Sequence, residues 1–265
     1  GSVSIVASQS GRILHRISKK YHSGGCHSVL LANLSQKRYL VCGTGHRYIS
    51  VFIDHFGGGL SFLRNLYGHK EQICLMTIIK NQYILSIGME KEIFFFMPDS
   101  EFPVFTFSVP IDICSVVDLP GDLFALGTSD GRIAIMQMHV QTPIRFVSVF
   151  GFDSSPITAL YADPTYTVAG NRNGLFAIFK GTSFEEKIVL RNSYSPITAI
   201  SGNASKSVIV VLDRQEDAYL FSLEYGAFIG KFGQEKPWQL NDPKQWDRES
   251  FIVNQEVKQK RQSIV

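Results

Sequence analysis

Short apolar runs, separated by small groups of polar residues, glycine and proline, follow one another along most of this chain. The runs are rich in valine, isoleucine and phenylalanine, as in IFFFM (93–97) and VIVVL (208–212). β-Branched and aromatic residues bounded by turn-forming residues are typical of β-strands. We therefore predict an all-β chain, and no helical periodicity is visible before residue 243.

The runs recur in groups of four with a period near 40 residues. The first run of each group carries an anchor, and the anchors are 44, 40, 44 and 40 residues apart: Val29, Ile73, Ile113, Ile157 and Ile197. The second run ends on a second anchor: Gly43, Gly88, Gly127, Gly170 and finally Leu212. A four-stranded unit of this size cannot bury both faces alone, so neighbouring units must stack. This repetition favours a β-propeller over a β-sandwich.

The segments between the second and third runs carry hairpin chemistry. Asp130-Gly131 and Asn173-Gly174 combine residues that tolerate the positive φ angles of tight turns. We predict that these four residues form structural turns.

We predict five complete blades and one half-blade. The blades span about 27–67, 70–109, 111–150, 155–191 and 195–232, and the half-blade spans 3–17. The propeller would thus occupy residues 1–234, and residues 235–265 would form a C-terminal capping segment and tail. The ring would have six or seven blades once other residues complete it.

Three sources for the strands missing from the half-blade stay open. They are further residues of a longer parent chain, the tail segment ESFIVNQ (249–255), and strands donated by a partner chain. We favour the longer parent chain, because an exposed sheet edge promotes aggregation.

Several residues resemble WD40 repeats. Gly68-His69 precedes a first strand, as the Gly-His dipeptide of that family does, and Ser129-Asp130-Gly131 resembles its second hairpin. The Trp-Asp pair that names the family is missing, and Ile53-Asp54 is the nearest substitute. The resemblance covers residues 3–232 and implies a degenerate WD40-like propeller.

The exit segment IGKFGQEKPWQLNDPKQW (229–246) contains the only two tryptophans of the chain. It resembles the segment that ends the propeller region in large WD-repeat proteins of cilia and flagella, some of which carry EF-hand-like domains. Aromatic side chains bury much apolar area per residue and can hold a returning chain against the last blade. We predict Phe232, Trp238 and Trp246 as capping anchors.

Composition sets broad limits on the class of protein. Hydrophobic residues make up 45% of the 265 residues and charged residues 18%. No apolar run reaches the roughly 18 residues of a membrane-spanning helix. The net charge of +3 is too small to indicate a nucleic-acid partner. We expect no membrane insertion, and we expect an intracellular protein whose four cysteines are buried free thiols.

The sequence contains histidines, cysteines and glycines of the kind found in metal and phosphate sites, but not at the spacing that such sites need. His22, Cys26, His27, Cys42, His46 and His55 have the side chains of zinc ligands but lack paired CxxC or HxxxH spacing. The glycine-rich segments 43–46 and 56–59 do not lie between a strand and a helix, as a phosphate-binding loop does. We predict no metal site and no cofactor.

The acidic residues and the basic tail are also weak signals. Glu185-Glu186 falls in an expected loop, and no nucleophile motif accompanies Asp112, Asp118 or Asp122. Lys258, Lys260 and Arg261 form a basic cluster that could contact an acidic surface such as tubulin, although a solvated chain end explains it as well.

These observations favour a non-catalytic scaffold that binds other proteins through the loops before the first strands. The candidate partner contacts are His69, Lys70, Asp153, Ser154, Ser193 and Tyr194. The ciliary resemblance implies a microtubule-associated complex of the axoneme. A scaffold subunit of a cytosolic assembly, in trafficking or RNA processing, is the alternative. A propeller hydrolase that uses Asp112 is a third hypothesis.

Overall fold

The computed structural model describes residues 3–7, 9–21, 24–34, 36–55, 59–138, 144–151, 153–181, 184, 187–240 and 242–253. The chain divides into two compact units, Gly1–Asp112 and Ile113–Val265. Strands dominate both units, and the helical elements of the described residues are single 3-10 turns.

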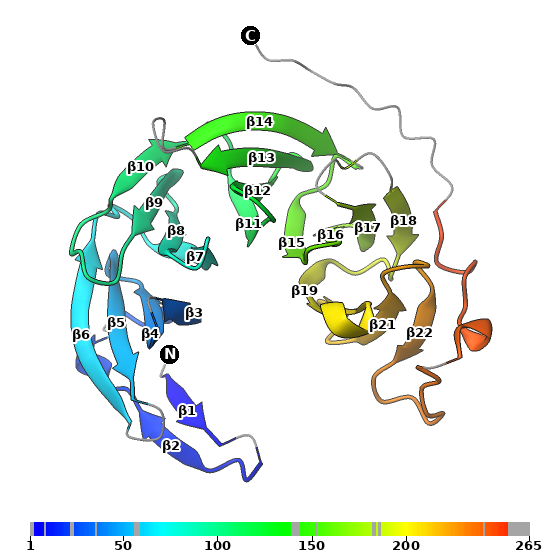
Figure 1. The fold of residues 1–265 in the computed structure, drawn as a ribbon, viewed down its shortest axis with the longest axis horizontal. Helices are drawn as coiled ribbons and strands as arrows, with labels where there is room; N and C mark the ends of the chain where they lie inside the picture. Colours follow the sequence, from blue (N-terminus) through cyan, green and yellow to red (C-terminus); the bar gives the residue numbers. More distant parts are fainter. Residues whose placement is uncertain are drawn as a thin grey trace. The chain divides into compact units, whose positions relative to one another are not determined.

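Unit 1 contains one two-stranded sheet and two four-stranded sheets, all antiparallel (Figure 1). The two-stranded sheet pairs β1 (Ser4–Val6) with β2 (Ile13–Arg16), and the 3-10 turn η1 (Lys19–Tyr21) follows it. The first four-stranded sheet has β3 (Cys26–Leu34), β4 (Lys37–Thr44), β5 (Tyr48–Asp54) and β6 (Leu60–Tyr67) in chain order. The second has β7 (Ile73–Ile79), β8 (Tyr83–Gly88), β9 (Glu92–Phe96) and β10 (Phe105–Ser108).

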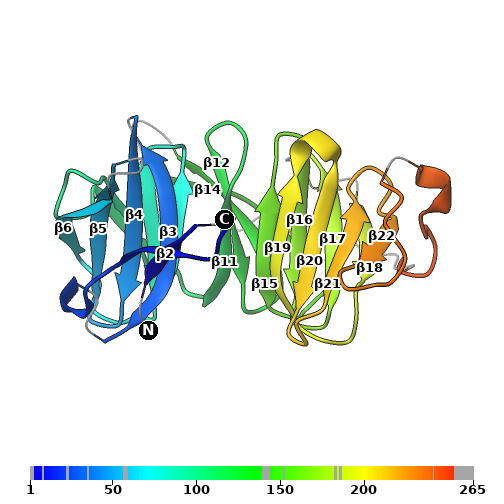
Figure 2. The same cartoon turned by 90° about the horizontal axis from the view of Figure 1, so that it is seen from below.

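Unit 2 contains three four-stranded antiparallel sheets with the same order of strands (Figure 2). The first has β11 (Ile113–Asp118), β12 (Leu123–Thr128), β13 (Arg132–Met138) and β14 (Ile144–Gly151). The second has β15 (Ile157–Ala162), β16 (Tyr166–Asn171), β17 (Leu175–Lys180) and β18 (Lys187–Arg191). The third has β19 (Ile197–Asn203), β20 (Val208–Asp213), β21 (Ala218–Ser222) and β22 (Phe228–Lys231). The 3-10 turns are η2 (Ala204–Lys206) and η3 (Pro243–Gln245).

This arrangement confirms the predicted fold class. Five sheets of four sequential strands and one sheet of two strands have the pattern of the blades and half-blade of a β-propeller. In each complete blade the strand order follows the sequence, so every connection is a hairpin or a short loop.

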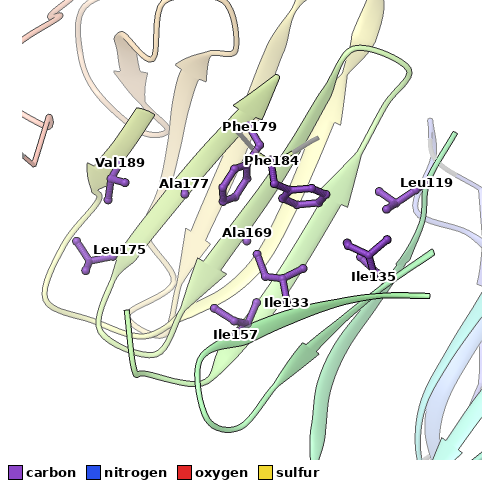
Figure 3. Packing of buried hydrophobic residues seen from close by; sticks show 11 residues of the cluster. Leu119, Ile133, Ile135, Ile157, Ala169, Leu175, Ala177, Phe179, Phe184 and Val189 are labelled. Atoms are coloured by element: carbon purple, nitrogen blue, oxygen red, sulfur yellow. The ribbon is translucent and has the colours of Figure 1, made fainter. Parts of the chain in front are cut away.

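Neighbouring blades stack face to face within each unit and bury apolar side chains between them. In unit 1 the blades β3–β6 and β7–β10 share a core that includes Val41, Ile49, Ile73, Phe94 and Phe96. In unit 2 the blades β11–β14 and β15–β18 share the core shown in Figure 3, which includes Ile133, Ile157 and Phe179. A third core lies between the blades β15–β18 and β19–β22.

The two sequence anchors of the repeat meet at these interfaces. A Cβ atom added to Gly43 would lie 3.1 Å from Ile73 Cγ2, and one added to Gly170 would lie 2.7 Å from Ile197 Cγ2. Gly127 has the same relation to Ile157, also at 2.7 Å. The glycine at the end of a second strand therefore makes room for the first-strand isoleucine of the next blade.

Gly88 departs from this register by one position. It pairs with Ile73 of its own blade, as Thr128 pairs with Ile113 and Asn171 with Ile157. A Cβ atom at Gly88 would overlap the carboxylate of Glu90, so this glycine makes room for a side chain of its own blade.

The predicted turn residues lie in the hairpins between second and third strands. Gly131 and Gly174 have φ angles of 83° and 75°, a region that favours glycine. Thr128 Oγ1 donates a hydrogen bond of 2.5 Å to Asp130 Oδ1, and Asn173 donates its backbone N–H to Asn171 Oδ1 at 2.9 Å.

The C-terminal segment closes the outer edges of two blades of unit 2 rather than extending the half-blade. Leu190 of β18 forms an antiparallel bridge with Ile252, and Phe228 of β22 forms one with Asp247. Figure 1 shows this segment, coloured orange to red, running beside β22 and β18. Of the three alternatives left open for the half-blade, the one that uses residues 249–255 is not supported for the described part, 249–253, because Ile252 bridges Leu190 of β18.

Candidate functional site

The loops that precede β7, β15 and β19 share a side chain that turns inward and braces the loop. His69, Asp153 and Ser193 each lie four residues before the first-strand isoleucine. Asp153 Oδ2 accepts a hydrogen bond of 2.9 Å from Nδ2 of the buried Asn171. Ser193 Oγ donates one of 2.9 Å to Oδ2 of the buried Asp213. These side chains therefore tie each loop to the end of the second strand of the same blade.

His69 is the most enclosed of the three bracing residues. Its Nδ1 lies 2.5 Å from Glu90 Oε1, and its Nε2 lies 2.7 Å from Ser86 Oγ. The residue is only 7% exposed. The prediction that His69 contacts a partner is therefore wrong, because its ring is buried and bonded to Glu90 and Ser86 within the blade.

The next residue in each of these loops points outward. Lys70 and Ser154 are exposed, and Tyr194 has 88% of its surface exposed. Each pair of predicted partner contacts thus separates into one bracing residue and one residue that faces solvent. The second member of each pair is the candidate for recognition.

The Tyr194 side chain is exposed, but neighbouring residues hold it and its loop in place. The guanidinium carbon of Arg191 lies 4.7 Å from the centroid of the Tyr194 ring, within the range of a cation–π contact. Nη1 of Arg191 also donates a hydrogen bond of 3.1 Å to the carbonyl oxygen of Asn173. Behind the ring, the loop is held by Ser193 and by the backbone of Asn192, whose N–H donates to Gly174 O at 2.9 Å.

Two further arginines lie at the same end of these blades. The register pairs Ile157 with Asn171 and Ile197 with Asp213, so the loops before β15 and β19 adjoin the second hairpin turns. Arg172 and Arg214 directly follow those strand ends and are exposed. Their backbone N–H groups donate to Pro156 O and Pro196 O at 3.0 and 2.8 Å. We call the residues Ser154, Arg172, Arg191, Tyr194 and Arg214 the loop surface.

The contact of Ser86, His69 and Glu90 has the atom types of a hydrolytic triad. Ser86 has no exposed surface and His69 almost none, so no substrate can reach the hydroxyl in this arrangement. Burial lowers the pKa of His69, and the hydrogen bond that Glu90 accepts from its ring opposes that shift in part. The geometry is that of a buried structural network.

The acidic residues singled out by the sequence do not form one centre. Asp112 is 63% exposed at its side chain and pairs with Lys91 at 3.0 Å. Asp118 lies within β11 and Asp122 lies in the turn before β12. Glu185 and Glu186 lie outside the described residues, as do Lys258, Lys260 and Arg261.

The described histidines and cysteines of the first blade do not form a metal-binding cluster either. His55 Nε2 lies 2.7 Å from Ser61 Oγ at the start of β6, whereas the ring of His46 lies against Gly24. His22 lies outside the described residues. Among those that are described, no three His, Cys, Asp or Glu side chains converge as metal ligands.

The predicted capping anchors pack along the exit segment of unit 2. Phe232 and Trp238 form an edge contact with ring centroids 4.5 Å apart. Trp246 Nε1 donates to Gln239 O at 2.8 Å, and its ring lies 6.1 Å from that of Tyr225. Phe251, which the sequence did not single out, inserts against Phe221 and Phe228 of the last blade.

Comparison of the chain with models of known protein families gives no match, and a search of curated proteins finds no relative. In the part of the chain that the structure describes, no helix is long and apolar enough to cross a membrane. The assignment of function therefore depends on the geometry of the loops.

Sequence reasoning missed Arg191, Arg172 and Arg214. A comparison of the loops FDSSPIT (152–158) and NSYSPIT (192–198) would have shown that the exposed position differs between blades while the flanking Ser-Pro-Ile is kept. The arginines can be recognised as part of this surface only from the structure, which places the hairpin turns beside these loops.

Proposed function

We propose that the chain is a non-catalytic WD-repeat scaffold that binds other proteins through the loop surface of unit 2. The observation that carries the proposal is Tyr194, which is 88% exposed on a loop held in place by Ser193 and Asn192. A large side chain fixed on a braced loop loses little conformational entropy on binding. Tyrosine and arginine are also enriched among the residues that dominate binding energy at protein interfaces.

The charges around Tyr194 favour a partner with acidic side chains. Arg172, Arg191 and Arg214 are donors of several hydrogen bonds, and arginine pairs with carboxylates in bidentate geometry. Two nearby acidic residues are engaged within the protein, because Asp153 accepts from Asn171 and Asp217 pairs with Lys231 at 2.7 Å, whereas Glu216 beside Arg214 is exposed. Three arginines against one exposed glutamate leave this end with a positive balance that suits an acidic partner.

We further propose that the partner belongs to a microtubule-associated complex of the ciliary or flagellar axoneme. This step rests on the resemblance of the exit segment 229–246 to ciliary WD-repeat proteins, and the acidic surface of tubulin matches the charge of the loop surface. A scaffold role in a cytosolic trafficking or RNA-processing assembly is the alternative. The two differ in where the protein is found rather than in the binding geometry.

The test uses axonemes extracted with detergent and polymerised tubulin. We expect the chain to co-sediment with one or both, and Tyr194→Ala combined with Arg191→Ala to reduce the bound fraction at least tenfold, because hot-spot residues contribute about 2 kcal/mol or more each. Recovery of the unaltered chain entirely in the soluble fraction would reject the axonemal role.

A charge-matched control lies at the other end of the last blade. Lys206 is an exposed cation in η2, between β19 and β20, whereas Arg214 follows the far end of β20. Arg214→Gln should weaken binding and Lys206→Gln should not. Equal loss from both would mean that net charge, and not the loop surface, governs binding.

A further inference from the structure

Cys26 and Cys42 lie on the same face of two paired strands in the first complete blade. Residue 43 faces Ser28, whereas Thr44 faces Cys26, so His27 is an extra residue that forms a bulge in β3. Because residues directly opposite each other share a face, Cys26 lies on the face of Thr44, and Cys42 lies on that face two residues away. The bulge thus brings two cysteines that are 16 positions apart in sequence onto one surface.

The two cysteines belong to one small apolar cluster. Cys26 packs against the core formed by Cys42, Leu40 and Phe52 of this blade and by Val3 and Ile17 beside β1 and β2. Cys26 Sγ donates a hydrogen bond to Ser28 O at 3.2 Å. Both cysteines are reduced.

The surroundings of the two sulfur atoms differ. Cys42 has no exposed surface, whereas Cys26 is only partly buried. The neighbouring Cys42 thiol lowers the pKa of Cys26, whereas the neighbouring Cys26 thiol and burial raise the pKa of Cys42. Cys26 is therefore the thiol that solvent reaches and that ionises first, and the thiolate is the reactive form.

We propose that Cys26 and Cys42 form an oxidation site, at which hydrogen peroxide converts the pair into a cross-strand disulfide. The thiolate of Cys26 attacks one peroxide oxygen, the O–O bond breaks, and hydroxide leaves, which gives the sulfenic acid of Cys26. The Cys42 thiol then loses its proton and its sulfur attacks the sulfenic sulfur. The S–S bond forms, and hydroxide leaves and takes up a proton to become water. The two thiols lose two electrons in total, and peroxide is reduced to two molecules of water.

The disulfide would join Cys26, the first residue of β3, to Cys42, two residues before the end of β4, at the place where Val3 and Ile17 pack on this blade. Oxidation would therefore stiffen the blade next to the half-blade. This inference does not depend on the binding role proposed for the loop surface, which lies in the other unit.

The test is oxidation of the purified chain with stoichiometric hydrogen peroxide, followed by tryptic digestion without reductant and mass spectrometry. Trypsin releases Cys26 within residues 21–37 and Cys42 within residues 39–47. We expect these two peptides to appear covalently linked, with the mass of two hydrogens lost, and the number of free thiols to fall by two. Sulfenic or sulfinic acid at Cys26 with reduced Cys42 in the unaltered chain would overturn the proposal.

Variants assign the roles of the two thiols. In Cys42→Ala, Cys26 should accumulate as sulfenic acid that dimedone traps, and in Cys26→Ser, Cys42 should stay reduced because it is buried. The exposed Cys74 provides the control, since Cys74→Ser should leave the linked peptide unchanged. If Cys42→Ala fails to fold, the linked peptide from the unaltered chain still decides. Faster oxidation of Cys74 than of Cys26 in that chain would count against the proposal.

Discussion

His69 Nδ1 lies 2.5 Å from Glu90 Oε1, and both side chains are almost fully enclosed by the blade β7–β10. The contact fills the space that Gly88 leaves open by lacking a side chain. In this blade Gly88 leaves room for the Glu90 carboxylate, which in turn contacts the His69 ring.

The first prediction concerns the pH dependence of stability. Because burial lowers the pKa of His69, the unfolded chain, with a histidine pKa of about 6.5, takes up the proton more readily than the folded one. The contribution of neutral His69 to the free energy of unfolding is therefore fully present above about pH 6.5, and it is lost as the pH falls through the lower pKa of His69 in the folded chain. Urea denaturation between pH 7.5 and 5.5 should therefore show a falling free energy of unfolding.

A pair of variants tests whether His69 causes this slope. His69→Gln should flatten it and should lower the stability at pH 7.5 by about 1–3 kcal/mol through the lost buried contacts. His55→Gln alters an exposed histidine and should keep the slope of the unaltered chain. An unchanged slope in His69→Gln would place the titrating group elsewhere.

The second prediction compares two glycines with positive φ. Gly174 has φ 75°, and an added Cβ would lie 2.1 Å from Ser193 O, whereas Gly181 has φ 69° and open space around it. Gly181→Ala should cost about 1 kcal/mol from backbone conformation alone. Gly174→Ala should cost at least about 2–3 kcal/mol and displace the loop that carries Tyr194. Thermal unfolding measures both, and equal costs would contradict the close packing of this turn.

The third prediction concerns the C-terminal segment. Phe251 packs against Phe221 and Phe228 with centroids 5.5 and 4.6 Å away. Phe251→Ala should lower the free energy of unfolding by about 1–2 kcal/mol, less than for a fully buried phenylalanine. Leu240→Ala, in the same segment but 50% exposed, should change it by less than about 0.5 kcal/mol. A smaller effect at Phe251 than at Leu240 would show that the segment is not anchored there.

The fourth prediction concerns a buried amide beside the loop surface. Both polar atoms of the Asn192 side chain are buried and have no hydrogen-bond partner in the described part of the chain. Burying an unpaired amide costs about 1–3 kcal/mol, so Asn192→Leu should raise the free energy of unfolding by about 1 kcal/mol. The backbone bond of Asn192 to Gly174 is kept in this variant. A marked loss of stability would mean that the amide has a partner.

Most of the fold could be predicted from the sequence because a β-propeller repeats one local pattern of strands and turns. The isoleucine and glycine anchors mark the places where successive blades touch, so their spacing reports the architecture directly. The sequence analysis placed Gly88 at the position of Gly127 and Gly170, which is off by one residue. Gly88 makes room for the Glu90 side chain of its own blade, and such a contact does not show in the spacing of the repeat. The pairing of residues 247–253 with β18 and β22 was missed for a related reason, since isolated bridges have no strand pattern.

The candidate site was less predictable than the fold. Sequence position identifies a loop, but it does not tell which side chain of the loop turns inward. His69 and Tyr194 occupy neighbouring positions of equivalent loops, and one is enclosed while the other is 88% exposed. The deciding factor is the partner available beside each loop. Asn171 and Asp213, at the ends of β16 and β20, bond Asp153 and Ser193, whereas His69 contacts Ser86 within β8 and Glu90 in the turn after it.

In these loops the residues that brace the fold are different from the residues that face solvent, so folding and partner recognition depend on separate positions. Substitutions at Ser154 or Tyr194 leave the tethers of Asp153 and Ser193 intact, so recognition can diverge at these positions while the blades keep folding. The same scaffold could thus be redirected to new partners by altering single outward residues, without re-engineering any strand.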